Sequence, residues 1–208
     1  MIFPPPQESW QPWSPAELRK RIGRSELIWA VVGGWALDLW HGRETRPHED
    51  LEFTVLAQQA DDCRHLLSGL RFYRVRDGAL RYQADDAPIS PDISQLWGCD
   101  RDFWRVDMMI DRGSESTWVY KRDPSLQIPR RDAVRINANG IPYLAPSLVL
   151  LFKAKYLRDK DQHDFDQALP RLTDREKRDL LNWLEKQHPG HVWIEVLTNW
   201  KGKSADLR

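Results

Sequence analysis

A short apolar run that ends in two glycines most strongly limits how this chain can fold. Residues 28–32, Ile-Trp-Ala-Val-Val, are rich in β-formers and are followed by Gly33 and Gly34. Residues 35–40 then have helical character. A buried strand, a glycine turn and a helix are therefore expected in succession. Glycines at such a turn let the backbone come close to phosphate oxygens, and the start of a helix favours an anion.

Two acids alternate with apolar residues in the next expected strand, over residues 51–56. Residues two apart in a strand point to the same face. Asp50 and Glu52 therefore project together, while Leu51 and Phe53 face the core. Adjacent carboxylates repel each other, and a divalent cation relieves this repulsion. Magnesium suits the pair, because it prefers hard oxygen ligands and keeps positions open for substrate phosphates.

A third acid, Asp107, interrupts an apolar strand that is expected over residues 103–110. Burying a lone carboxylate is costly, so this residue needs a partner. If its strand lies beside the first pair of acids, the three carboxylates form one cluster that holds metal ions and clamps the attacking and departing oxygens. Asp107 could also accept the proton of an attacking hydroxyl. The alternative for this residue is a salt bridge to Arg101 or Arg105.

The remaining patterns predict two parts of different character. Residues 1–145 read as an α/β (α+β) domain and residues 146–208 as a helical domain. Residues 84–101 read as a long loop, because they contain prolines, a glycine and many acids. Further strands are expected over residues 72–75, 80–83, 118–120, 133–136 and 141–144, and further helices over 15–22, 58–67, 147–158, 161–169, 174–187 and 191–200.

Composition argues against nucleic acid as the main partner. Lys plus Arg and Asp plus Glu both number 31, so the formal net charge is zero, whereas a protein that binds a polyanion usually has a basic excess. No apolar run, residues 148–152 included, approaches the roughly 20 residues of a membrane span, and residues 1–6 lack the features of a signal peptide. We expect no membrane association and a cytoplasmic location. Cys63 and Cys99 are then reduced thiols, with one disulfide as the alternative.

The 11 tryptophans are unusually many for 208 residues. Trp97, Trp104 and Trp118 stand beside polar runs, and exposed tryptophan is common at interfaces and around flat ligands. The tryptophan content therefore favours a binding surface or a homodimer.

Taken together, these motifs resemble those of a known family. The run Gly33-Gly34-Trp-Ala-Leu-Asp, followed by Gly42-Arg43-x-Thr45-Arg46-x-His48-x-Asp50-Leu51-Glu52, is similar to the minimal nucleotidyltransferases of the DNA polymerase beta superfamily. Within that superfamily it resembles the aminoglycoside 2″-adenylyltransferase-like group. The resemblance covers roughly residues 29–170. It implies a nucleotidyltransferase-type mixed sheet with flanking helices, followed by a helical C-terminal lobe.

The resemblance also implies roles for the matching residues. Asp50, Glu52 and Asp107 match the acids that bind Mg²⁺ and act in catalysis, and Gly33 and Gly34 match the turn that receives the phosphates. The commoner pair in the family is Asp-x-Asp, whereas this chain has Asp-x-Glu. A nucleotide-binding module that has lost catalysis therefore stays open as an alternative.

Four basic residues complete the implied nucleotide site. Arg46 and His48 fall in the threonine-arginine-x-histidine stretch before the paired acids, although His48 can equally cap or orient the loop. Lys153 and Lys160 lie in a segment that resembles the helical part of related enzymes. Seven residues apart on one continuous helix, they would share a face and reach triphosphate oxygens. The alternative is that both lysines are simply solvated.

The implied reaction is attack of an acceptor hydroxyl on the α-phosphorus of a nucleoside triphosphate, with AMP transferred from ATP. The expected partners are this triphosphate and a small-molecule acceptor. An aminoglycoside antibiotic is the leading acceptor, which would make the protein a resistance enzyme. Transfer to tRNA or to a protein hydroxyl, as in toxin-like relatives, is the alternative. Five acids of the long loop could attract a polycationic sugar: Asp85, Asp86, Asp92, Asp100 and Asp102.

Overall fold

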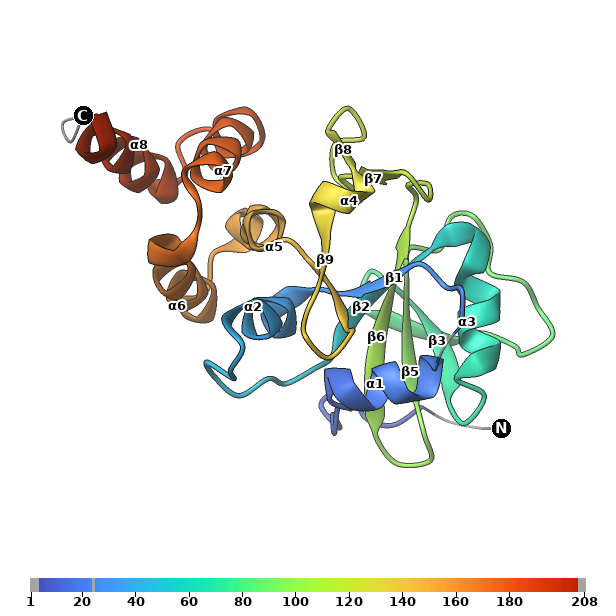
Figure 1. Cartoon of the computed structure of the whole chain (residues 1–208). Helices are drawn as coiled ribbons and strands as arrows, with labels where there is room; N and C mark the ends of the chain where they lie inside the picture. Colours follow the sequence, from blue (N-terminus) through green and yellow to red (C-terminus); the bar gives the residue numbers. More distant parts are fainter. Residues whose placement is uncertain (1–3, 24, 206–208) are drawn as a thin grey trace. The chain divides into compact units, whose positions relative to one another are not determined.

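A computed structural model describes residues 4–23 and 25–205. The chain divides into two compact units, Met1–Leu144 and Ala145–Arg208. The first unit contains strands and helices, and the second contains helices (Figure 1). The expectation about a signal peptide concerns residues 1–6, of which residues 1–3 lie outside the described residues.

A mixed sheet forms the first unit. In the described part of the chain it has eight strands in the order β4-β3-β5-β6-β2-β1-β10-β9. The pairs β2–β6 and β1–β10 are parallel, and the other neighbours are antiparallel. The strands are β1 (Trp29–Val31), β2 (Glu52–Leu56), β3 (Arg71–Arg76), β4 (Ala79–Tyr82), β5 (Gln95–Cys99), β6 (Trp104–Asp111), β9 (Val134–Ile136) and β10 (Pro142–Leu144), and β7 (Thr117–Val119) pairs with β8 (Gln127–Pro129) in a separate ribbon.

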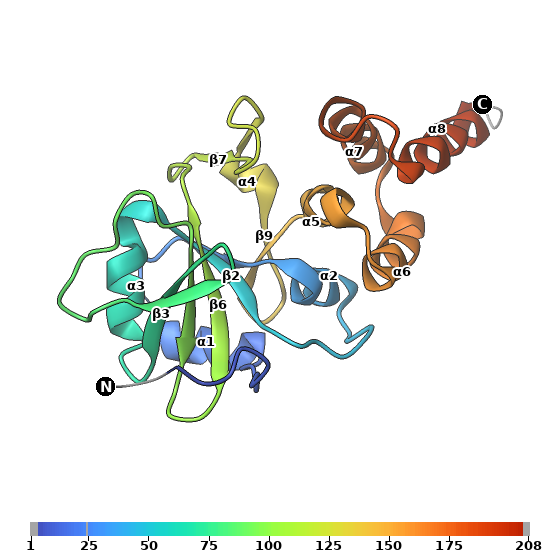
Figure 2. The same cartoon turned by 180° about the vertical axis from the view of Figure 1, so that it is seen from behind.

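Helices flank this sheet, which confirms the expected α/β fold. The helices of this unit are α1 (Pro15–Ile22), α2 (Gly33–His41), the short η1 (Ala57–Gln59), α3 (Ala60–Leu66) and α4 (Arg130–Ala133). Helix α1 contacts α3, and it lies in front of the sheet in Figure 1 and behind it in Figure 2. Its start is as expected, because the Ser14 hydroxyl accepts a hydrogen bond from the Glu17 N–H at 3.2 Å.

Side-chain alternation gives the two central strands one apolar face and one polar face. Phe53 and Val55 of β2 are fully buried, as are Val106 and Met108 of β6. The residues between them point to the opposite face, and these include Glu52 and Asp107. The sheet therefore has its core on one side and the acids on the other.

An N-terminal arm runs beside the start of β6. The backbone N–H of Gln11 donates to the Trp104 carbonyl at 3.1 Å, and that of Trp13 donates to the Arg105 carbonyl at 3.1 Å. The Trp104 indole N–H donates to the carbonyl of Pro6 at 2.8 Å. These bonds fix the arm to the beginning of the strand that carries Asp107.

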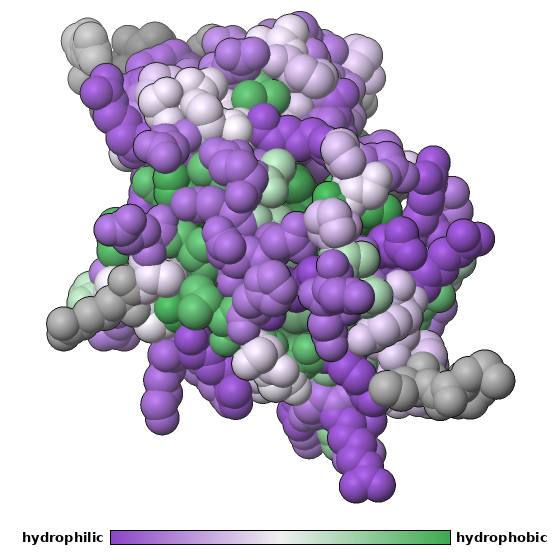
Figure 3. All heavy atoms as spheres, turned by 90° about the vertical axis from the view of Figure 1, so that its right-hand side faces the viewer, coloured by the Kyte–Doolittle hydropathy of each residue, from purple (hydrophilic) through white to green (hydrophobic). Residues whose placement is uncertain are grey.

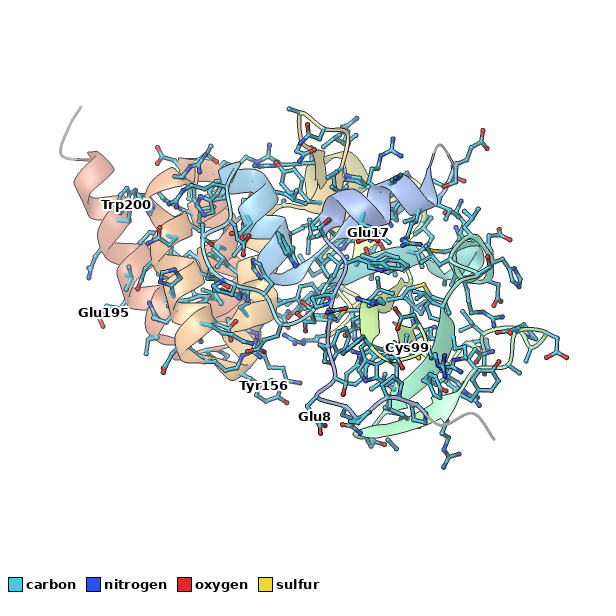
Figure 4. All side chains as sticks on the ribbon, turned by 90° about the horizontal axis from the view of Figure 1, so that it is seen from below. Glu8, Glu17, Cys99, Tyr156, Glu195 and Trp200 are labelled. Carbon is cyan, nitrogen blue, oxygen red and sulfur yellow. The ribbon has the colours of Figure 1, made fainter. Side chains whose placement is uncertain are left out.

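The second unit consists of helices, among them α5 (Pro146–Lys153), η2 (Ala154–Tyr156), α6 (Asp159–Ala168), η3 (Leu169–Arg171), α7 (Asp174–Gln187) and α8 (Val192–Ala205). Phe165 stacks on Trp193 with ring centroids 4.2 Å apart. The ammonium of Lys177 lies 3.7 Å from the ring centroid of Trp200. Tyr156 is 70% exposed. Trp200 and Tyr156 are labelled in Figure 4. Within the described residues, none of the helices has the length and apolar character that a bilayer crossing requires.

Several expectations about the elements are wrong. Strand β5 lies inside the stretch that was expected to be a loop, residues 84–101, and it pairs with both β3 and β6. The helix expected over 147–158 ends at Lys153. Trp104 and Trp118 are 0% and 4% exposed, so these two tryptophans form core and give no support for a dimer surface. Both cysteines are free and buried, and Cys99 lies among the strands in Figure 4.

The surface that Figure 3 displays is mainly hydrophilic, with small apolar areas between the polar side chains. Scattered apolar residues of this kind are normal for a folded protein. This face therefore offers no argument for a partner surface.

Candidate active site

The glycine turn and Glu52 occupy adjoining space. Helix α2 begins at Gly33 itself, so the two glycines form its first turn instead of a separate loop before it. Gly33 has φ +64°, in the left-handed region, and a Cβ built on it would lie 2.0 Å from Glu52 Oε2. Only glycine leaves room for the Glu52 carboxylate at this position.

Asp107 lies directly across the sheet from Glu52. The two residues are partners in the parallel β2–β6 ladder, and the Asp107 N–H donates to the Leu51 carbonyl at 2.8 Å. Asp50 comes two residues before Glu52, outside the strand itself. Burial and the negative charges of Glu52 and Asp50 raise the pKa of Asp107 well above its ordinary value. The structure therefore brings the three predicted acids into one electrostatic neighbourhood.

One carboxylate oxygen of Asp107 is buried without a partner. Gln95 Nε2 donates to Asp107 Oδ2 at 2.7 Å, while Oδ1 has no hydrogen bond within the described part of the chain. Trp97 is the ladder partner of Asp107 on β5, and its indole N–H acts on this carboxyl as a donor that partly offsets the rise in pKa, although the two atoms do not meet strict hydrogen-bond geometry. Buried polar atoms are nearly always satisfied, so either a ligand atom or a closer approach of the Trp97 indole would complete the hydrogen bonding of Oδ1.

The acids fit magnesium by their chemistry. Asp50, Glu52 and Asp107 supply hard oxygen ligands, and a dication would favour the ionised form of Asp107 that burial and its neighbours disfavour. As placed, however, no three His, Cys, Asp or Glu side chains among the described residues make up a group that could hold a metal ion. The acids adjoin one another without forming a closed ligand cage.

Arg46 and His48 lie against the second glycine. A Cβ built on Gly34 would be 2.5 Å from Arg46 Nη2 and 2.6 Å from His48 Cε1. Both ring nitrogens of His48 have partners, Asp38 at 2.5 Å and Arg46 at 3.2 Å, and its side chain is 3% exposed. This geometry supports the orienting alternative for His48 and leaves Arg46 as the basic group at the turn.

The two predicted lysines do not lie on one helix, so that expectation is wrong. Lys153 is the last residue of α5, and Lys160 belongs to α6. The ammonium of Lys153 lies 2.8 Å from Asp161 and 2.9 Å from Asp164, and both acids are buried. Lys153 therefore neutralises buried carboxylates inside the helical unit.

Three residues of the candidate site were not predicted from the sequence as part of it. Gln95 was not predicted because the segment that contains its strand was interpreted as a loop. Asp38 is part of the glycine motif, but the sequence analysis gave it no role. Lys121 follows β7, and the residue is exposed as a whole although its ammonium is partly shielded from solvent. Desolvation lowers its pKa, while the charges of Asp107 and Glu52 act in the opposite direction. The ammonium therefore lies in the field of both acids, and no sequence pattern signals this.

A separate hollow of about 510 Å³ lies elsewhere on the first unit. Its lining includes Glu26, Gln59, Asp62 and His65. It contains none of the predicted site residues, and it is an open surface depression without paired acids beside a glycine turn. We therefore place the candidate site at the carboxylates.

A model of the aminoglycoside-2''-adenylyltransferase family matches residues 16–168, most of the chain. The chain belongs to the aminoglycoside-2''-adenylyltransferase family. This membership confirms the resemblance drawn from the glycine and acid motifs, and it makes the protein a nucleotidyltransferase. The family match includes all of the candidate site residues named above.

One solved structure shows that the fold is shared, and two more are similar to the chain. The solution structure of the antibiotic-resistance factor ANT(2'')-Ia is 15% identical, with 92% of this chain and 91% of that chain covered and a TM-score of 0.52. Its crystal structure with adenylyl-2''-tobramycin is 13% identical (92% and 95% covered, TM-score 0.48). The lincosamide antibiotic adenylyltransferase LnuA with lincomycin is 16% identical (73% and 89% covered, TM-score 0.48). A comparison with curated proteins gave no significant match.

Proposed function

We propose that this family member transfers AMP from ATP, in a reaction that requires Mg²⁺, to a hydroxyl group of an aminoglycoside. The observation that carries the proposal is the buried carboxylate of Asp107, which stands across the ladder from Glu52 and whose pKa is raised by burial and by that neighbouring charge. Glu52 in turn adjoins the glycine turn. A buried acid whose pKa is raised by burial and by neighbouring carboxylates, beside a glycine turn at a helix start, is typical of a catalytic site.

Each group of the site has a proposed task. Asp50, Glu52 and Asp107 would hold Mg²⁺, which when bound neutralises charge on the triphosphate. The N–H groups at the start of α2 and the Arg46 guanidinium receive phosphate oxygens. The acceptor oxygen forms a bond to the α-phosphorus, the bond between the α- and β-phosphates breaks, and pyrophosphate leaves. The hydroxyl proton passes to a carboxylate, for which Asp107 is the candidate base.

The aminoglycoside acceptor rests on family membership and not on the acidic loop. Asp92 is hydrogen-bonded to Arg76 at 3.1 Å, and Asp100 is bonded to Arg105 at 2.6 Å. These acids are already paired, so they attract a polycation less than five free carboxylates would. A cytoplasmic location remains a proposal, supported by the two free thiols. A homodimer also remains a prediction.

The direct test incubates the purified protein with ATP, Mg²⁺ and a panel of aminoglycosides and measures product masses. We expect one added adenylate on at least one aminoglycoside, together with release of pyrophosphate. Asp107→Asn should reduce the rate by about 10²–10⁴-fold. Asp92→Asn is the matched control, because it replaces an aspartate that is exposed and outside the site.

Each other outcome has a distinct meaning. Adenylylated tRNA or protein, with unmodified aminoglycosides, would show that the acceptor is wrong. Calorimetric binding of Mg²⁺-ATP without pyrophosphate release would identify a nucleotide-binding module that has lost catalysis. Wild-type protein that neither binds nor turns over ATP contradicts the proposal as a whole.

A further inference from the structure

Asp38 is a buried carboxylate beneath the glycine turn, on the second turn of α2. It is 4% exposed. Its Oδ1 accepts hydrogen bonds from the Thr45 N–H at 3.1 Å and from the Thr45 hydroxyl at 2.5 Å, and its Oδ2 lies 2.5 Å from His48 Nε2. Burial acts to raise the pKa of Asp38, but the hydrogen bonds from His48 and Thr45 outweigh it and hold the pKa below its ordinary value. The group is therefore an ionised acceptor.

This acceptor decides which nitrogen of His48 carries the proton. An ionised carboxylate only accepts, so Nε2 of His48 must donate. On the other side of the ring, Nδ1 lies 3.2 Å from Arg46 Nη1. A guanidinium only donates, so Nδ1 must be bare and accept. One tautomer satisfies both contacts, and the ring is held against Trp35 with centroids 4.4 Å apart.

Arg46 is thereby fixed at the glycine turn. Its Nη1 donates to His48 and also to the Pro47 carbonyl at 3.1 Å. Its Nη2 lies so close to Gly34 that a Cβ there would be 2.5 Å away. A guanidinium presents its donors in a rigid fork, so fixing Nη1 also aims the rest of the group.

We infer that Asp38 is a positioning residue, which selects the His48 tautomer that holds the Arg46 guanidinium against the glycine turn. The inference rests on the proposed function in one respect, namely that the nucleotide's phosphates bind at this turn. A purely structural role is the competing explanation, since Asp38 also fixes the loop through Thr45. The two explanations differ in what an isosteric substitution does.

Asp38→Asn keeps the shape and reverses one hydrogen bond. The amide oxygen still accepts from Thr45, while the amide nitrogen now donates toward His48 Nε2. His48 must then carry its proton on Nδ1, which sets two donors against each other at Arg46. Replacing the aspartate that orients a histidine by asparagine is known to enforce the wrong tautomer. Arg46 should therefore leave the turn while the fold persists.

The experiment combines ¹⁵N NMR of the His48 ring with steady-state kinetics and calorimetric binding of Mg²⁺-ATP. In the wild type we expect a protonated Nε2 and a bare Nδ1. In Asp38→Asn we expect the protonation of the two nitrogens to be exchanged. Nucleotide affinity should fall about 10–100-fold, the loss expected when one hydrogen bond to a charged group is removed. KM for ATP should rise more than kcat falls.

Two further variants separate positioning from stability. Thr45→Val removes the hydroxyl bond to Asp38 but leaves the Asp38–His48 contact, so it should lower stability without exchanging the tautomer. His48→Gln presents an amide that can donate to Asp38 and accept from Arg46. The nucleotide affinity of His48→Gln should therefore lie closer to the wild-type affinity than the affinity of Asp38→Asn does. If Asp38→Asn does not fold, the wild-type spectrum and the nucleotide affinity of His48→Gln measured against the wild type decide the matter.

The inference fails if wild-type His48 carries its proton on Nδ1. It also fails if folded Asp38→Asn binds Mg²⁺-ATP as tightly as the wild type, or if His48→Gln binds no better than Asp38→Asn. Those results leave the proposed function intact, because the wild type still binds and transfers. Loss of nucleotide binding in the wild type itself would instead overturn the proposed function, while the tautomer remains measurable.

Discussion

At the scale of single residues, Gly33 and Glu52 depend on each other. The glycine has a left-handed backbone and no side chain, and the space that a side chain would need holds the Glu52 carboxylate. The longer acid of this Asp-x-Glu pair is therefore accommodated by the turn beside it. A substitution at position 33 tests the placement of Glu52 more specifically than removal of an acid does, because Glu52 itself stays in the protein.

We predict that Gly33→Ala loses activity by displacing Glu52. An alanine at positive φ costs about 1–2 kcal/mol of stability, and displacement of a site group by about 1 Å can cost 10²-fold in rate. Gly140→Ala is the matched control, because Gly140 has φ +72° and nothing within 4 Å of its Cβ. Unfolding and kcat/KM are measured for both. Equal activity of the two variants would show that Glu52 is not displaced.

At the scale of elements, α5 and α6 are held together by a buried ionic cluster. Lys153 contacts Asp161 and Asp164, which are 0% and 3% exposed. Arg158 adds a hydrogen bond to Asp161 at 2.7 Å. This cluster belongs to the packing of the helical unit.

We predict that Lys153→Met destabilises the protein by about 3 kcal/mol, because removal of one partner leaves buried charge uncompensated. Lys155→Met is the control, since Lys155 is exposed on the adjoining short helix. Thermal and denaturant unfolding provide the measurement. Normal stability of Lys153→Met with a raised KM for ATP would return Lys153 to the phosphate-binding role expected from the sequence.

The elements also show where sequence patterns succeed and where they fail. The amphipathic α7 was predicted over its observed range from its helical periodicity, and the structure adds a Thr173–Glu176 capping box at its start. Strand β5 was missed, because Gly98 reads as a loop residue. In the sheet, a Cβ at Gly98 would come within 3.0 Å of Phe72, Val106 and Leu70, so this glycine serves close packing. Such a tertiary reason leaves no local pattern.

Some residues of the candidate site could likewise be predicted from local sequence patterns, and others could not. The paired acids and the glycines could be found from alternation and turn composition, which are local. Asp107 was found because an acid in an apolar strand needs a partner. Gln95 and Lys121 come from segments that only the folded sheet brings near Asp107. Lys153 was misassigned because a helical pattern does not show that the helix ends at that residue.

At the scale of the whole molecule, the unliganded site is a source of instability that ligands should relieve. The pKa of Asp107 is raised in the folded state. Its contribution to stability is therefore fully present below the pKa of an unfolded aspartate, about 4, and is lost as the pH rises through the folded value. As the pH rises through this range, the unfolding free energy of the metal-free wild type should fall relative to that of Asp107→Asn.

We predict that Asp107→Asn is more stable than the wild type at neutral pH without metal, and that Mg²⁺ with a non-hydrolysable ATP analogue reverses the order. A ligand at 100 times its Kd adds about 2.7 kcal/mol to the wild type and less to the variant. Unfolding is followed at several pH values. Asp92→Asn should shift in the opposite sense, because the hydrogen bond from Ser90 lowers the pKa of Asp92. Parallel pH curves for wild type and Asp107→Asn would contradict the prediction.

The arm beside β6 has a consequence for how the chain acquires this site during synthesis. The Trp104 indole and the Pro6 carbonyl are bonded across a separation of 98 residues, so the arm leaves the ribosome long before its partner exists. Contacts between such distant segments form slowly, because a large loop must close first. The bonds between the arm and the strand that presents Asp107 therefore form only after that strand has been synthesised and the long loop between them has closed.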